Sequence, residues 1–206
     1  RALFQFRQDF YIKRWSILRF HWRREVKQQT ITIYEAAMQG ASQLAELLEL
    51  GRNINEEHDG VADGTALMIA SREGHADVVE LLLASKADPT IKDTYGWTAL
   101  MIAAEEGNAV VVKLLLANKA DPSIQNIKGN KALMFAAFQG HADVVKLLLA
   151  NKADPNSQAK NRVTALIVVA DKGYADVVEL LLANQADPNI KDINGETALM
   201  FASRKG

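Results

Sequence analysis

The sequence has no cysteine, and its 206 residues include only four histidines and four prolines. Without cysteine the chain can form no disulfide framework, no thiolate metal site and no cysteine nucleophile. No apolar stretch approaches the roughly 20 residues that a membrane-spanning helix needs. The first residues also lack the basic, apolar and small-residue segments of a signal peptide. We therefore expect an intracellular, cytoplasmic protein without a membrane span.

The net charge of -1 conceals an uneven distribution of charge along the chain. Residues 1–30 contain eight Lys and Arg residues against Asp9 and Glu25, so the remainder of the chain is net acidic. Hydrophobic residues make up 49% of the sequence, which is enough to build a continuous core. We expect a basic aromatic helical segment over residues 1–30 and a separate folded domain over residues 31–206.

The few prolines all occupy one position of a 33-residue repeat. Each follows an aspartate, in the pairs Asp88-Pro89, Asp121-Pro122, Asp154-Pro155 and Asp187-Pro188. The same period recurs in a glycine column of Gly74, Gly107, Gly140, Gly173 and Gly206. A threonine column contains Thr65, Thr98, Thr164 and Thr197, with Lys131 in the remaining place. Because proline fixes φ and has no N–H, each proline should end one helix and begin an extended connection.

Each repeat contains two short helical patterns followed by a turn. In residues 98–107 a capping hydroxyl precedes an apolar run that a glycine closes. Residues 108–116 then carry Val and Leu at helical spacing. Turns such as residues 93–96 end in a glycine that can adopt the positive φ of a tight hairpin. One such unit cannot bury both helices, so we expect stacking, which contributes about 1.5–3 kcal/mol for each large aliphatic side chain buried.

The pattern Asp93-x-x-Gly96-x-Thr98-Ala-Leu-x-x-Ala-x-x-x-Gly107, continued by a Val-Val pair and Ala120-Asp121, resembles the ankyrin repeat. The resemblance covers residues 64 to 206, and a degenerate first repeat precedes it within residues 31–63. It implies an all-α ankyrin-repeat solenoid of stacked helix-turn-helix units with hairpin loops, preceded here by the N-terminal helical segment. The last repeat is incomplete. We expect either a sequence cut from a longer protein or a short cap formed by residues 197–203.

The chain departs from the family pattern in three columns. Methionine replaces the usual histidine at Met68, Met101, Met134 and Met200, so packing should replace a polar contact. The usual glycine after the second helix is replaced by Lys86, Lys119, Lys152 and Gln185, each at a cost on the order of 1 kcal/mol in the left-handed region. Arg162 and Lys131 fill the usual glycine and threonine places, so their hairpins are the least regular.

No pattern of residues indicates catalysis, a cofactor or a metal centre. His75 and His141 follow repeat glycines at equivalent positions, which favours a contact between adjacent repeats over a catalytic role. The cluster of residues 56–59, Glu-Glu-His-Asp, lacks the fixed ligand spacing of a metal site and is expected to be a solvated loop. We therefore expect a protein that is not an enzyme.

The resemblance implies that partner proteins bind along the concave side, formed by the hairpin tips and the first helix of each repeat. Phe138 and Trp97 form the candidate aromatic anchor, because Phe138 is an aromatic residue in a column that is otherwise charged and is expected to lie near Trp97 and Tyr95. Alternatively, Trp97 only covers the neighbouring hairpin. Acidic side chains around the anchor favour a partner with basic residues. The candidate partner-binding residues are Tyr95, Trp97, Glu105, Glu106, Asn130, Phe138, Gln139, Val163, Asp171, Lys172 and Arg204.

The basic segment has two apolar stripes when it is wound as a helix. One stripe, the candidate N-terminal docking site, contains Phe4, Tyr11, Trp15, Leu18 and Trp22. Because a surface helix needs one apolar face, two faces predict a second contact. The segment could cap the first repeat or connect domains, bind a partner such as a calmodulin-like protein, or lie on a membrane surface through residues 1–28. The acidic remainder of the chain disfavours nucleic-acid binding.

These patterns together predict a monomeric stack that acts as a noncatalytic protein–protein interaction scaffold. The alternative is an ankyrin module that positions substrate for, or regulates, a larger enzyme or bacterial effector. A second domain in the full reading frame would favour the alternative.

Overall fold

The computed structural model describes residue 37, residues 53–55 and residues 64–204. Over these residues the regular secondary structure is entirely helical, as the repeat pattern predicts. The helices are α4 (Ala66–Glu73), α5 (Ala76–Ala84), α6 (Ala99–Glu106), α7 (Ala109–Ala117), α8 (Ala132–Gln139), α9 (Ala142–Ala150), α10 (Ala165–Lys172), α11 (Ala175–Ala183) and α12 (Ala198–Ser203).

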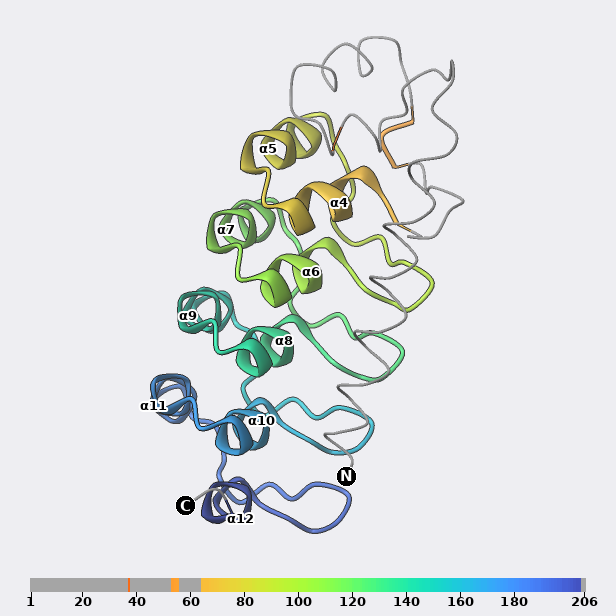
Figure 1. Cartoon of the computed structure of the whole chain (residues 1–206). Coiled ribbons are helices and arrows are strands. Elements are labelled where there is room, and N and C mark those ends of the chain that lie inside the picture. Colours follow the sequence, from red (N-terminus) through yellow and green to blue (C-terminus); the bar gives the residue numbers. More distant parts are fainter. Residues whose placement is uncertain (1–36, 38–52, 56–63, 205–206) are drawn as a thin grey trace, which may run out of the picture.

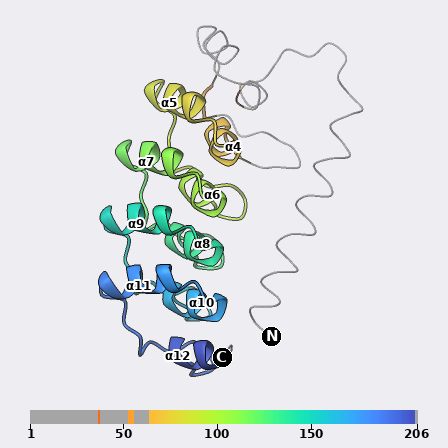
Figure 2. The same cartoon turned by 60° about the vertical axis from the view of Figure 1, so that its left-hand side comes forward.

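The helices form two layers. The inner layer stacks α4, α6, α8, α10 and α12 in that order, and the outer layer stacks α5, α7, α9 and α11. Each outer helix also packs against the inner helix that precedes it in the chain. The rotated view in Figure 2 separates the layers into two parallel columns. This arrangement confirms the predicted all-α solenoid.

The inner helices begin and end where the threonine and glycine columns predict. The hydroxyls of Thr98 and Thr164 accept hydrogen bonds from the third backbone N–H of their helices. Thr65 has the same extended backbone without such a bond. The closing glycines take left-handed φ values, as Gly107 does with φ of 74°. Only glycine adopts this conformation without strain, which explains its recurrence.

The core consists of the same apolar columns in successive repeats. In α6 the side chains of Leu100, Met101 and Ile102 are buried between neighbouring helices. Met68 and Met134 are also buried, which confirms that the methionine column is packing material. At α12 the same columns are uncovered: Leu199 is 76% exposed, whereas its equivalent Leu100 is 1% exposed. Stacking against a following helix therefore buries these positions.

The outer helices end in a left-handed residue that is not glycine. Lys86, Lys119, Lys152 and Gln185 have φ between 65° and 68°, which confirms the strained conformation that the sequence predicts at these positions. Asn118, just before one of these lysines, donates from its side-chain amide to the carbonyl of Leu114 at 2.9 Å. This bond satisfies a carbonyl at the helix end and partly offsets the strain.

Four hairpins connect the described repeats and are numbered here along the chain from residues 93–96. Three of them are closed by a buried Asp or Asn side chain. The Oδ1 atom of Asp93 accepts hydrogen bonds from the backbone N–H groups of Tyr95 and Trp97, at 2.9 and 2.8 Å. Asn126 and Asp192 hold their own turns in the same way. The third hairpin has Ala159 at this position and therefore lacks that side-chain acceptor.

The third hairpin nevertheless closes through its backbone. Ala159 N donates to the carbonyl of Val163 at 3.0 Å, and Arg162 N donates to the carbonyl of Ala159 at 2.8 Å. Arg162 adopts φ of 61° at the position where three other hairpins have glycine. The third hairpin is therefore irregular in its side chains, as predicted, whereas its backbone hydrogen bonds follow the pattern of the other hairpins.

The Asp-Pro column also organises the connection that follows each outer helix. Asp88 Oδ1 accepts from the hydroxyl and the N–H of Thr90, at 2.7 and 2.8 Å. These hydrogen bonds hold the pKa of Asp88 below its usual value. Likewise, hydrogen bonds from Ser123 lower the pKa of Asp121, and the Lys131 ammonium adds a smaller effect in the same direction. Each aspartate is thus a turn acceptor beside the proline.

A further contact between repeats comes from the residue after each repeat glycine. The Nε2 atom of His141 lies 2.9 Å from the carbonyl oxygen of Glu105, which is near the end of α6 in the repeat before. Asn108 Nδ2 donates to the carbonyl of Ser71 at 3.0 Å in the repeat before. A Cβ atom on Gly107 would lie 2.7 Å from the His141 ring. The predicted contact of His141 between repeats is therefore confirmed.

The predictions for the N-terminal part lie almost wholly outside the described residues. These are the basic helical segment over residues 1–30, the degenerate repeat within residues 31–63, and the acidic loop over residues 56–59. The candidate docking stripe also lies there: Phe4, Tyr11, Trp15, Leu18 and Trp22.

Comparison of the repeat glycines Gly107 and Gly173 tests the contact that the His141 ring makes between adjacent repeats. Both have left-handed φ, but nothing lies within 4 Å of a Cβ built on Gly173. We expect Gly173→Ala to lower the free energy of unfolding by about 1 kcal/mol through backbone strain alone. Gly107→Ala should cost clearly more, because the His141 ring must move. Urea denaturation of both variants checks this, and equal losses would contradict the role of His141.

Candidate functional site

The last turns of the stacked inner helices form one row of side chains, here called the inner-helix surface. It holds seven of the candidate residues: Glu105, Glu106, Phe138, Gln139, Asp171, Lys172 and Arg204. Positions 33 residues apart lie on neighbouring helices, because α6, α8, α10 and α12 pack side by side. Glu106 and Arg204 are exposed, and the other five are partly buried. The register thus brings these residues together as the sequence predicts.

Phe138 is covered on one face by a lysine from the next inner helix. The Lys172 Nζ atom lies 4.1 Å from the centroid of the Phe138 ring, which is a cation–π contact. The pair joins the last turns of α8 and α10 and places a positive charge beside the acidic residues of this surface. The surface is therefore mixed in charge around its aromatic residue, whereas the sequence predicts a mainly acidic character from Glu105, Glu106 and Asp171.

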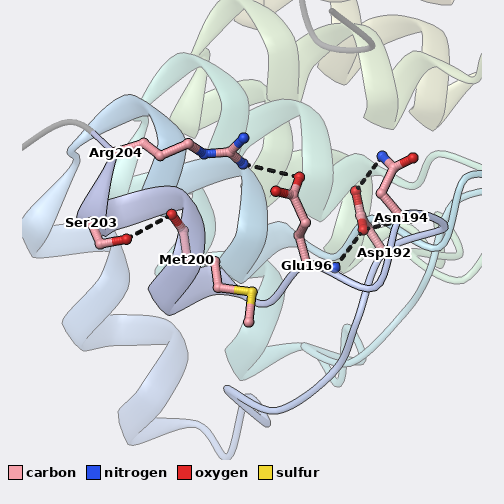
Figure 3. A network of polar contacts seen from close by, with 6 residues as sticks. All are labelled: Asp192, Asn194, Glu196, Met200, Ser203 and Arg204. Carbon is pink, nitrogen blue, oxygen red and sulfur yellow. Dashed lines mark hydrogen bonds and ion pairs between the residues drawn. The ribbon is translucent and has the colours of Figure 1, made fainter.

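Arg204 is held by its own repeat. Its guanidinium lies 3.0 Å from Glu196 Oε2 and stacks 4.6 Å from the Phe201 ring centroid. Figure 3 shows that Glu196 reaches Arg204 from the hairpin where Asp192 also accepts hydrogen bonds from the turn. A partly exposed ion pair of this kind contributes about 0–1 kcal/mol, so Arg204 can exchange it for a contact with a partner.

Trp97 is not a surface anchor, and this candidate is corrected by the structure. Its side chain is 3% exposed and belongs to the core. Its ring lies 4.1 Å from that of Phe135, one turn before Phe138 in α8, with the two planes tilted by 33°. This contact with α8, the inner helix of the next repeat, explains the burial. Trp97 is therefore a packing residue, but its ring contacts helix α8, whereas the alternative interpretation places it over the neighbouring hairpin.

Two further candidates occupy the same column and are also buried. Asn130 is 6% exposed, and its backbone N–H donates to Asn126 Oδ1 within the hairpin. Val163 lies in the core cluster. The prediction that these two residues bind a partner is wrong for the same reason as for Trp97. The side chains of all three residues, at the same position just before the inner helix of their repeats, are buried. Tyr95, two residues before Trp97, is 58% exposed and stays a candidate.

Sequence reasoning missed two exposed apolar residues at the hairpin tips. Ile127 and Ile193 occupy equivalent positions just after the Asn or Asp of their turns and are 53% and 67% exposed. The signal was present in the sequence, because an isoleucine at a turn position where the other repeats have Thr94 and Lys160 serves no packing purpose. Ile127 lies beside Tyr95, whose carbonyl accepts from the Ile127 N–H, and Ile193 lies beside Asn161 of the third hairpin.

In the part of the chain that the structure describes, no three His, Cys, Asp or Glu side chains gather as metal ligands. No helix among these residues is long and apolar enough to cross a bilayer.

The stacked helix pairs and their hairpins define a helical repeat protein of the solenoid class. Residues 33–126 and 133–206 match the family model described as ankyrin repeats (3 copies). Residues 110–149 match a second model, ankyrin repeats (many copies). The chain belongs to the ankyrin-repeat family, whose members are typically noncatalytic and mediate protein–protein interactions. No curated protein matches the chain.

The neighbouring aromatics Tyr95 and Trp97 provide a test of the corrected assignment. We expect Trp97→Ala to lower the free energy of unfolding by about 3–5 kcal/mol, because it leaves a cavity beside Phe135. Tyr95→Ala should change it by no more than about 0.5 kcal/mol, since the side chain is mostly in solvent. Chemical denaturation followed by circular dichroism measures both. A small effect of Trp97→Ala would show that the ring is not part of the core.

Proposed function

We propose that this chain is a noncatalytic recognition module that binds another protein through its inner-helix surface. The supporting observation is the contrast between two kinds of column in the same helices. The buried column of Leu100, Leu133 and Leu166 is constant, as stacking requires. The column of Glu105, Phe138, Asp171 and Arg204 changes at every repeat. Stacking does not require this variation, which is what a surface fitted to one partner would have.

Phe138 is the proposed anchor of that surface. It is partly buried, so little of its conformational freedom remains to be lost on binding. Lys172 fixes one face of the ring and supplies a positive charge, while Glu106 and Asp171 supply negative charge nearby. The complementary partner carries an apolar side chain for Phe138 and basic groups for the carboxylates. We propose that the ankyrin-repeat chain itself acts as a monomer in the cytoplasm.

The alternative role, a substrate-positioning or regulatory module of a larger enzyme or bacterial effector, would use the same surface. The two roles differ in what the rest of the reading frame encodes.

The test compares Phe138→Ala with Val110→Ala, a matched apolar truncation on the exposed side of outer helix α7. Proteins captured by the unaltered chain should also be captured by Val110→Ala. Their affinity for Phe138→Ala should fall about thirtyfold, the effect of losing a central aromatic anchor. Calorimetry with each captured protein measures the change, and circular dichroism confirms that both variants fold. Equal affinities of the two variants would refute the proposed site.

A further inference from the structure

The hairpins form a second continuous surface, the hairpin edge, which comprises residues 90–97, 123–131, 156–163 and 189–196. Figure 1 shows these loops projecting from the same side of the helix layers, one after another along the stack. Main-chain hydrogen bonds link the successive hairpins: Ile127 N to Tyr95 O at 3.1 Å, Lys160 N to Lys128 O at 3.0 Å, and Ile193 N to Asn161 O at 3.1 Å. The tips are therefore held in a fixed row.

The acidic side chains of the hairpin edge form hydrogen bonds or ion pairs within the chain. Asp93 and Asp192 are buried, where each accepts hydrogen bonds from the N–H groups of its own turn. Glu196 is paired with Arg204. These three are the acidic residues of the four hairpin segments, against six Lys and Arg residues. The four segments therefore carry an excess of positive charge, and burial of Asp93 and Asp192 keeps these carboxylates from direct contact with a partner.

Five of the six basic side chains of the same segments are exposed, and one of these, Lys92, also donates from Nζ to the carbonyl of Gln125 at 3.3 Å. Lys131 is partly buried and donates to Ser157 Oγ at 3.0 Å. The other five are exposed: Lys92, Lys128, Lys160, Arg162 and Lys191. The hairpin edge therefore presents positive charge, although the chain as a whole has a net charge of -1.

Apolar and charged side chains follow an order along this edge. Tyr95 is the exposed apolar residue of the first hairpin, Ile127 that of the second and Ile193 that of the fourth. The third hairpin has Lys160 and Arg162 instead. Single exposed apolar residues are common on protein surfaces, but three at the tips of one hydrogen-bonded row form a patterned surface. Each hairpin also carries an exposed Lys or Arg, and the third has two of them and no exposed apolar residue.

We propose that the hairpin edge binds an extended acidic polypeptide segment that also carries apolar side chains. Its carboxylates face the third hairpin and Lys191 of the fourth, and its apolar side chains face Tyr95, Ile127 and Ile193 at the tips of the other three. Inner helices pack about 8–10 Å apart, so four hairpins span about 25–30 Å, which an extended segment covers with about nine residues. The inference rests on the proposed recognition function and adds a second partner chemistry, opposite in charge to that of the inner-helix surface.

A polypeptide fits this edge better than a nucleic acid does. Phosphates could pair with the lysines, but they would leave Tyr95 and Ile127 without apolar contacts. Carboxylates on the adjoining inner-helix surface, such as Glu106 and Asp171, would also repel a phosphate chain longer than the edge. An acidic segment with apolar residues matches both properties of the edge.

The experiment selects binders from a random library of peptides of about twelve residues, slightly longer than the edge, displayed against the full chain. Selection is repeated on Lys160→Glu/Lys191→Glu and on the control Lys113→Glu/Lys146→Glu. The control changes the net charge equally on the exposed faces of α7 and α9. Circular dichroism establishes that both double variants fold. Enriched peptides are then titrated by fluorescence anisotropy at two salt concentrations.

The proposal predicts enriched peptides that combine Asp or Glu with Leu, Ile or Phe. Their affinity should fall at least tenfold for Lys160→Glu/Lys191→Glu, remain within twofold for the control, and weaken with salt. Tyr95→Ala/Ile127→Ala should also weaken binding of these peptides but not of polyglutamate.

Enrichment of basic or uncharged peptides would overturn the proposal, as would peptides indifferent to the hairpin-edge variant. Binding of an oligothymidylate or of phosphatidylserine vesicles in place of peptides would overturn it in favour of a phosphate ligand. These outcomes do not depend on Phe138, so the proposed inner-helix site can fail or hold separately. Phe138→Ala is included to show this independence.

Discussion

The packing of each helix pair against the next is the interaction on which this structure depends. The inner and outer helices of a repeat, such as α6 and α7, have only 8 and 9 residues. Helices this short are unstable alone in water, so they require their neighbours. Burial of the Leu, Met and Val columns between repeats supplies that stability. It also offsets local strain, including the left-handed lysines after the outer helices and Arg162 in the third hairpin.

The same packing determines how surface residues are arranged. Because every repeat has the same length, a given position lines up along the stack, and its residue type is unconstrained wherever the side chain faces solvent. Two surfaces of different character result. The inner-helix surface combines Phe138 with charges of both signs, while the hairpin edge is basic because its Lys and Arg residues outnumber its acidic residues and five of the six are exposed. Both proposed recognition surfaces are therefore rows of residues that recur with the period of the repeat.

Much of the fold follows from the sequence because its determinants are local. Proline, glycine and threonine columns mark the ends of helices, and the left-handed conformation of Lys119 follows from its place after an outer helix. The candidate surface was harder to predict, because burial depends on neighbouring repeats. Trp97 has the composition of an interface residue, yet its ring contacts Phe135 from the next repeat. The Lys172 contact on Phe138 likewise joins two helices and leaves no local pattern.

The central claim is that stacking in a fixed register holds the molecule together, and deletion of one full period tests it most directly. Removing residues 131–163 joins Asn130 to Thr164 and keeps every column aligned, whereas removing residues 131–147 breaks the register. Urea unfolding followed by circular dichroism compares the two. The account predicts that the full-period deletion folds cooperatively with a smaller m-value and lower stability, since it lacks one unit and one interface. It predicts that the partial deletion loses cooperative folding. Equal behaviour of the two deletions would contradict the claim.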